Sequence, residues 1–296
     1  MLFGVTIVAF LLLHLTPGDP VETMLGENAT PAQAADVRAR LGLDRPLAEQ
    51  YVRYVGRLLR GDLGDSILAQ RPVLDYVVER MPATAKLAFA AFALALLAGI
   101  PLGVLAAVRR ESSLDYTARG LALLAQSIPG MWLGLMLMTV FAVRLRVLPS
   151  IGADTLVHLI LPAVTLASFI VGLVVRLTRS SVLDVLFEDY VRTARAKGLS
   201  ERAVLARHVV RNALVPVVTV LGLQLGALLG GAVVTEAVFA WPGLGSLVLQ
   251  AINQRDYPVV QAVVLLSALT FLVINFVVDL VNVWLNPRLR LEGGDG

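Results

Sequence analysis

The chain has 296 residues, of which 57% are hydrophobic and only 16% are charged, with a net charge of +3. Its mean hydropathy of +0.77 is far too high for a soluble domain, so the composition excludes a soluble globular protein and predicts several membrane spans. Cysteine is absent, which excludes disulfides, thiolate metal sites and cysteine nucleophiles. The three histidines, His14, His158 and His208, lack the spacing of metal ligands.

Lysine is almost absent as well. Of the 25 basic residues, only Lys86 and Lys197 are lysines, and each follows an alanine. A P-loop needs a lysine preceded by glycine to hold nucleotide phosphates, so the chain carries no Walker A site of its own. We therefore expect a protein that is not an enzyme, with no catalytic residues, no metal and no cofactor of its own.

The first apolar segment, residues 1–15, lacks the basic flank and the cleavage site of a signal peptide. It is short for a hydrocarbon core of about 30 Å. We interpret it as a transmembrane helix whose start codon has been assigned too far downstream. Upstream in-frame DNA should then encode several more residues, including Arg or Lys.

The next stretch, residues 17–80, is too polar to cross a membrane but patterned enough to fold. Thr30 and Pro31 are typical of the start of a helix that Gly42 can end. Pro46 can open a second helix, and its apolar face comprises Leu47, Tyr51, Tyr54, Val55 and Leu58. This stretch is interpreted as a small helical cap on the membrane surface or, alternatively, as a docking surface for an extracytoplasmic partner.

Five further spans of about 17 to 24 residues carry no formal charge, as a membrane crossing requires. They are residues 87–108, 120–143, 159–175, 213–235 and 257–278. With the first segment, they predict an all-α polytopic membrane protein with six transmembrane helices. We divide the chain into residues 1–80, the first transmembrane helix with an extracytoplasmic helical segment, and residues 81–296, a five-helix core with a cytoplasmic loop at residues 180–212.

Glycines recur every four residues in two of the spans, at Gly99 and Gly103 and at Gly222, Gly226 and Gly230. This spacing lets helix backbones approach closely. We expect these glycines to form helix–helix contacts within one subunit; the alternative is that they line a substrate path.

The centres of the spans hold no charged residue. A proton- or ion-coupled carrier usually needs one, and an intramembrane enzyme needs a catalytic pair at membrane depth. Uncharged polar residues can still hydrogen-bond a neutral or zwitterionic solute, and Gln126, Ser127 and Gln224 are candidates for a translocation path. The energy for transport should therefore come from another subunit.

The loops differ in charge. Thirteen Arg and Lys residues lie after the second span, after the fourth span and at the C-terminal end, against three in the short loops of the other side. The positive-inside rule places the first set, and with it both termini, in the cytoplasm.

The loop at residues 180–212 holds most of these charges. Glu188 and Asp189 suit the N-terminal end of a short helix, Arg195 and Lys197 suit its C-terminal end, and Gly198 stops it. A second helix begins at Ser200, with an apolar face made of Val204, Leu205, His208 and Val209. The loop therefore predicts a helix–glycine–helix elbow that projects from the membrane; the alternative is a solvated basic loop.

Residues 190–198 (YVRTARAKG) resemble the cytoplasmic coupling motif of inner-membrane permease subunits of binding-protein-dependent ABC importers. Arg192 and Thr193 replace the usual Glu and first Ala, and Arg211 replaces a proline, departures that peptide-type permeases share. The Arg leaves no glutamate there for a specific contact with the ATPase. The resemblance to dipeptide and oligopeptide permeases extends over residues 16–20, 41–45, 61–66, 148–154, 236–245 and 255–258.

This resemblance implies the type I permease fold of ABC importers and a location in the cytoplasmic membrane of a prokaryote. The subunit, of the B type, would form a heterodimer with a second homologous permease. Two partner ATPases would hold ATP and Mg, and an extracytoplasmic solute-binding protein would deliver the substrate. Membrane lipid would surround the complex, and no nucleic-acid partner is expected.

The resemblance also assigns roles to residues. Coupling to the ATPases falls to Asp189, Tyr190, Arg192, Thr193, Ala194, Arg195, Ala196, Lys197 and Gly198. Candidates for an outer gate or a binding-protein contact are Glu236, Trp241, Asp256 and Tyr257. The expected substrate is a dipeptide, an oligopeptide or glutathione, and residues 150–154 look most like glutathione-type permeases. The alternatives are import of nickel or an oligosaccharide by the same machine, or a secondary carrier.

Overall fold

A computed structural model describes residues 2–15, 44–230 and 232–285, with five isolated positions between residues 30 and 39. Within these residues the regular structure is helical, apart from one bridge between Asp65 and Pro72. The predicted all-α class is confirmed. Most of the helix expected after Thr30, and the 16–20 stretch, lie outside the described residues.

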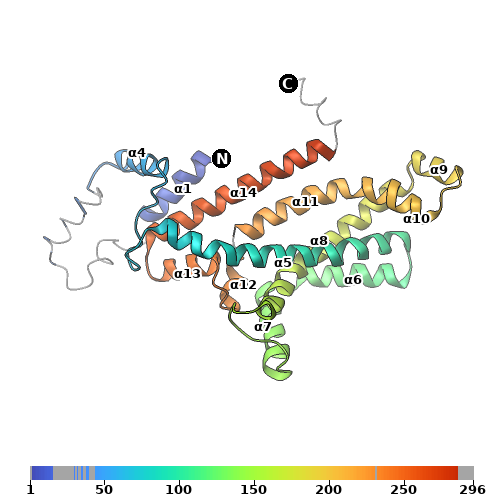
Figure 1. Ribbon diagram of the computed structural model, residues 1–296, viewed down its shortest axis with the longest axis horizontal. Coiled ribbons are helices and arrows are strands. Elements are labelled where there is room, and N and C mark those ends of the chain that lie inside the picture. Colours follow the sequence, from blue (N-terminus) through green and yellow to red (C-terminus); the bar gives the residue numbers. More distant parts are fainter. Residues whose placement is uncertain are drawn as a thin grey trace, which may run out of the picture.

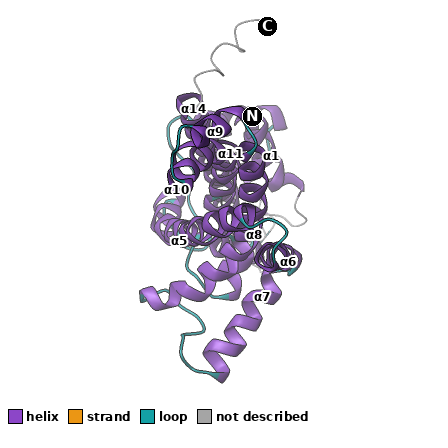
Figure 2. Ribbon diagram, turned by 90° about the vertical axis from the view of Figure 1, so that its right-hand side faces the viewer, coloured by secondary structure: helices purple, strands orange, loops and turns teal. Residues whose placement is uncertain are grey.

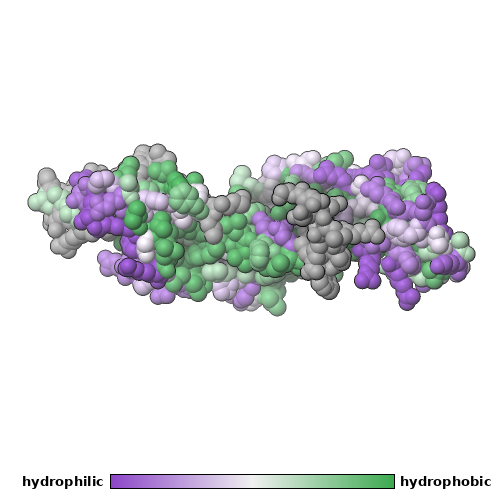
Figure 3. Space-filling model, turned by 90° about the horizontal axis from the view of Figure 1, so that it is seen from above, coloured by the Kyte–Doolittle hydropathy of each residue, from purple (hydrophilic) through white to green (hydrophobic). Residues whose placement is uncertain are grey.

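Four long helices run along the length of the molecule (Figure 1) and are long and apolar enough to cross a membrane. They are α5 (Val73–Val108), α8 (Ile160–Leu186), α11 (Arg211–Leu229) and α14 (Tyr257–Leu285). Figure 3 shows hydrophobic residues over the middle of one face and hydrophilic residues at both ends. The long axis of the helices therefore follows the membrane normal.

Shorter helices flank this bundle. They are α1 (Leu2–Leu15), α4 (Leu47–Leu58), α6 (Ser113–Ser127), α7 (Gly130–Leu137), the π-helical η1 (Met138–Arg144), the 3-10 turn η2 (Leu156–Leu159), α9 (Asp189–Ala196), α10 (Glu201–Val204), the π-helical η3 (Leu205–Val210), α12 (Val233–Val238) and α13 (Leu244–Asn253). Together with the long helices, α1 and the α6–α7 pair are compatible with six crossings.

The third predicted span is not one straight helix. Between α6 and α7 the chain bends by 101°, and α7 projects sideways from the bundle (Figures 1 and 2). Pro129 explains the break, because a proline has no amide hydrogen and disfavours a helical conformation in the residue before it. Ile128 is accordingly extended, with φ −78° and ψ 123°. The fifth predicted span also differs: α11 ends at Leu229, before the expected end at residue 235.

The spaced glycines lie mainly where helices touch. A Cβ atom on Gly99 would lie 2.7 Å from Val174 Cγ1, and α5 therefore packs closely against α8. Gly222 faces Val278 in the same way, which joins α11 to α14. The predicted contacts within one subunit are confirmed for these glycines. Gly230 differs, because its only close neighbours are carbonyls of its own helix.

The second helix predicted within residues 17–80 is present as α4, which follows Pro46 and packs on α1; its position outside the cytoplasm stays a prediction. The hydroxyls of Tyr51 and Thr6 are 2.8 Å apart, and Phe10 contacts the rings of Tyr51 and Tyr54. Leu47, at the start of the predicted apolar face, is 54% exposed. The predicted division at residue 80 falls inside α5, which begins at Val73.

Candidate functional site: the coupling elbow

The loop at residues 180–212 folds as a helix–glycine–helix elbow, at the end of the molecule opposite α4 and α13 (Figure 1). Gly198 follows α9 with a φ of +77°, a left-handed conformation that glycine adopts without strain. Its amide donates to the Arg195 carbonyl at 2.9 Å. Ser200 caps α10, its hydroxyl accepting from the Ala203 amide. The turn is therefore fixed by the backbone.

A small apolar core attaches the elbow to the membrane helices. Val191 of α9, Val204 of α10 and Val209 of η3 are fully buried. They share one cluster with Val182 of α8 and Ala107 of α5. Buried valines interlock at interior packing density, so α9 and the inner end of α8 should move together.

The other faces of the elbow are open to a partner. Of the predicted coupling residues, Ala194 is buried, and the exposed ones are Asp189, Tyr190, Arg192, Thr193, Arg195, Ala196, Lys197 and Gly198. Arg195 Nε pairs with Glu201 Oε1 at 2.8 Å, which ties α9 to α10. Arg192 Nη1 is 3.4 Å from Asp189 Oδ1, with both side chains largely exposed. Exposed pairs of this kind are weak, so these charges remain available to a partner.

Two contributors to the elbow were missed by the sequence reasoning. Val191 anchors α9 in the core. The sequence signal that could have indicated this role is the spacing of two apolar residues, Val191 and Ala194, three positions apart among polar residues in a short amphipathic helix. Asn212 Nδ2 donates to Tyr190 Oη at 3.1 Å and to the His208 carbonyl at 2.8 Å. That side chain joins the start of α11 to Tyr190 of α9, which is 22 residues earlier in the chain. Sequence periodicity reports contacts within one helix and so cannot predict this one.

A cavity of about 290 Å³ lies beside the break between α6 and α7. Gln224 of α11, Ser168 of α8 and Thr235 of α12 contribute polar groups to its wall, among mainly apolar neighbours. The other two predicted path residues do not line it. Gln126 lies against Gly172 and donates to the Ala122 carbonyl, and Ser127 donates to the carbonyl of Leu123 in its own helix.

The four predicted gate residues are buried rather than displayed. Glu236 is fully buried; its carboxylate accepts from Thr84 Oγ1 at 2.7 Å and from the Ser246 amide at 3.0 Å. Burial raises the pKa of the Glu236 carboxyl, and these hydrogen bonds partly oppose the rise. Trp241 Nε1 donates to the Ala83 carbonyl at 2.8 Å. Glu236 and Trp241 therefore fasten the outer loop to α5.

A second set of contacts holds the segment just before α14, next to Tyr257, which is also buried. Asp256 accepts from Ser66 Oγ at 2.5 Å and from the Ile67 amide at 3.2 Å. In this conformation the buried gate residues shape the outer end instead of presenting a surface. Their assignment to a gate or to a binding-protein contact stays a prediction.

The long apolar helices and the exposed, charged elbow at their end are the features expected of a membrane-embedded permease. The chain belongs to the family of binding-protein-dependent transport system inner membrane components, whose family model matches residues 99–291. The model of the N-terminal part of such membrane components matches residues 1–88. The predicted family is confirmed, and with it a multi-pass protein of the inner membrane.

Relatives of known name agree. The chain is 46% identical to the glutathione transport system permease protein GsiC of Salmonella paratyphi A, over 97% of this chain and 94% of that protein. It is 43% identical to the dipeptide transport system permease protein DppB of Escherichia coli K12, with the same coverage.

Solved structures share the fold. The MetNI methionine ABC transporter in an inward-facing conformation matches with a TM-score of 0.60 and 21% identity, over 71% of this chain and 96% of that chain. An amino acid ABC transporter solved with histidines matches with a TM-score of 0.54 and 14% identity, over 70% and 92%. The ABC importer permease fold is confirmed.

Proposed function

We propose that this chain is a permease subunit of an ATP-driven importer and translocates small peptides, glutathione or dipeptides among them. The observation that carries the proposal is the elbow, whose backbone is fixed by Gly198 and whose exposed face is ready for a partner. The family and the 46% and 43% identities to glutathione and dipeptide permeases support the choice of substrate.

The partners follow from the same reasoning. A second homologous permease would complete the membrane path, and two ATPases that bind ATP and Mg would receive the two elbows. A solute-binding protein would deliver substrate at the end that holds α4 and α13. The excess of Arg and Lys on the elbow side supports a cytoplasmic elbow and cytoplasmic termini.

ATP would act through the elbow. Closure of the ATPases would move α9, and the buried valines would pass that movement to α8. A rigid-body movement of the inner helix ends would then switch the permease between inward- and outward-open states. The outer end, held by the buried contacts of Glu236, Trp241 and Asp256, would stay in place while the inner helix ends move.

The solute path would pass the cavity beside the helix break. The Gln224 amide can donate and accept at once, which suits the backbone amide of a peptide. Broken helices near the middle of a membrane are also favourable places for a solute. Gln224 is therefore our preferred path residue, ahead of Gln126 and Ser127.

Whole cells test the proposal. We expect disruption of the gene to abolish ATP-dependent uptake of labelled dipeptide or glutathione, and a plasmid copy to restore it. Unchanged uptake of both in the disrupted strain, together with lost uptake of nickel or an oligosaccharide, would keep the importer and reject the peptide.

A further inference from the structure

An ion pair between a buried carboxylate and a partly exposed arginine joins α6 to α8 near the elbow. Asp115, in the first turn of α6, is fully buried, and Arg179 of α8 binds it with two hydrogen bonds, Nε to Oδ1 at 2.6 Å and Nη2 to Oδ2 at 2.8 Å. Two-pronged pairs of this kind fix both distance and orientation. Among the described residues, no other ion pair connects these two helices.

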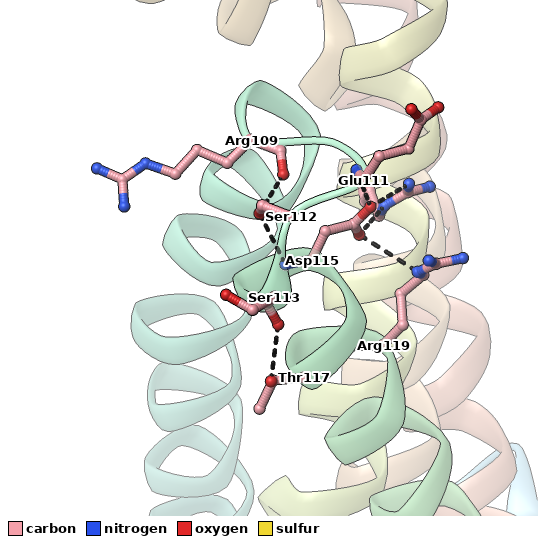
Figure 4. Close-up of polar contacts among 8 residues, drawn as sticks. Arg109, Glu111, Ser112, Ser113, Asp115, Thr117 and Arg119 are labelled. Atoms are coloured by element: carbon pink, nitrogen blue, oxygen red, sulfur yellow. Dashed lines mark hydrogen bonds and ion pairs between the residues drawn. The ribbon is translucent and has the colours of Figure 1, made fainter.

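The carboxylate is held in place from its own helix as well (Figure 4). The Glu111 amide donates to Asp115 Oδ2 at 3.0 Å, and the Ser112 hydroxyl accepts from the Asp115 amide at 3.3 Å. Arg119, one turn along α6, places Nε 3.3 Å from Asp115 Oδ1. Asp115 is therefore a rigid part of the start of α6.

Much of the rest of the α6–α8 contact is close packing around small residues, with Leu114, Val171 and Val175 beside them. Gly172 of α8 lies so close to α6 that a Cβ atom there would be 2.5 Å from the Ala122 carbonyl oxygen. Ala118 and Ala122 share a cluster with Val175. These apolar contacts bring the two helices close together, but they carry no charge and no hydrogen bond between side chains of the two helices that is comparable to the ion pair. The ion pair is thus the directional contact between the inner ends of the two helices.

Arg179 stands next to the elbow. It precedes Val182 by three residues on α8, one helical turn, and Val182 belongs to the buried core that holds Val191 of α9. A continuous set of contacts therefore leads from α9 through α8 to Asp115. It continues along α6 to the break at Pro129, next to the cavity that contains Gln224.

We propose that the Asp115–Arg179 pair is the joint that makes α6 follow the coupling elbow. With the joint closed, the elbow, the inner part of α8 and α6 form one lever, whose hinge is the break at residues 127–130. This inference rests on the proposed function, because the lever has a role only if partner ATPases move the elbow during transport. Asp115 and Arg179 act as positioning residues and do not contact the solute.

Distances between spin labels test the joint directly. The chain contains no cysteine, so Ser113→Cys at the start of α6 and Ala206→Cys on η3 place labels on two exposed residues of the lever. The complete complex, with accessible cysteines of the partners replaced, is measured without nucleotide and after trapping with ATP and vanadate. We expect the label distance to stay constant in the parent protein and to change by about 2 Å or more in Arg179→Ala.

Arg119→Ala is the matched control. This variant removes one positive charge that pairs with Asp115, as Arg179→Ala does. Arg119 and Asp115 both belong to α6, however, so their pair does not connect two helices. We expect the label distance in this variant to stay constant. In Arg179→Ala, Arg119 still balances the charge of Asp115 and the Glu111 amide still donates a hydrogen bond to it, which should let the variant fold.

Transport gives a second readout. Substrate taken up per ATP hydrolysed should fall about fivefold or more in Arg179→Ala and stay near the parent value in Arg119→Ala. A label distance that changes in the parent protein, or equal behaviour of the two variants, would overturn the joint. Label distances require only nucleotide trapping, so failure of peptide uptake in the parent complex would instead refute the proposed substrate.

Discussion

Replacement of Gly198 tests how the elbow transmits force. The residue has a φ of +77°, and a Cβ atom added there would meet nothing within 4 Å. The cost of a side chain is therefore conformational, roughly 1–2 kcal/mol for alanine. Proline, whose ring holds φ near −65°, cannot form the turn at all and also removes the amide that donates to Arg195. We estimate at least about 3 kcal/mol for Gly198→Pro.

These costs predict an order of effects. Substrate imported per ATP hydrolysed should decrease from the parent to Gly198→Ala and further to Gly198→Pro, measured in reconstituted complexes at equal membrane levels. Arg192→Ala is the comparison variant: the loss of its exposed pair with Asp189 costs less than about 1 kcal/mol, so Arg192→Ala should lower coupling less than Gly198→Pro does. Full coupling in a well-expressed Gly198→Pro variant would refute the elbow as a rigid lever.

Three further predictions concern packing, the path and the outer end. Gly99→Ala should lower the unfolding free energy in detergent by about 1–3 kcal/mol, because its Cβ would press on α8, whereas Gly120→Ala, with open space, should have little effect. Gln224→Leu should weaken peptide uptake while basal ATPase activity is retained, and Gln126→Leu should not; equal effects would exclude the cavity as a path. Burial raises the pKa of Glu236, so the folded state holds the proton more tightly than the unfolded state, and stability should increase as the pH falls through the raised pKa towards the ordinary value of 4.5. A melting curve of Glu236→Gln with the same pH dependence would contradict this.

Local signals predicted the elbow and the helices well. The elbow depends on Gly198, on Ser200 and on charges at helix ends, all of which act within a few residues of each other. Glycine spacing likewise predicted helix–helix contacts at Gly99 and Gly222, because a four-residue repeat places glycines on one helix face; the partner helices, α8 and α14, come from the structure. Apolar runs located the spans but not the full helices: α5 begins at Val73, 14 residues before the predicted start at residue 87, and α8 ends at Leu186, 11 residues after the predicted end at residue 175.

The break in the third span carried a signal that hydropathy conceals. Residues 120–143 are uniformly apolar, and the average hides Pro129, whose effect on the preceding residue bends the chain by 101°. The burial of the outer loop carried no signal in the sequence. Glu236 and Trp241 follow the fifth predicted span, and tertiary contacts with α5, which the sequence does not show, bury both residues.

Long-range pairs lay beyond sequence reasoning. Asp115 and Arg179 are 64 residues apart, and Glu236 meets Thr84 across 152 residues. Taken alone, Asp115, Arg179 and Glu236 are ordinary charged residues near the ends of spans, and Thr84 is an ordinary uncharged polar residue. Only the packing of α6 on α8, and of the outer loop on α5, brings the partners together.

The most direct test of peptide import is uptake into proteoliposomes that contain this chain, its partner permease, the two ATPases and the binding protein. Labelled dipeptide, oligopeptide and glutathione are supplied outside with the binding protein, with ATP or a non-hydrolysable analogue enclosed. We predict uptake of at least one peptide class that requires both ATP hydrolysis and the binding protein. ATPase activity that responds to the binding protein without uptake of any peptide would contradict the assigned substrate.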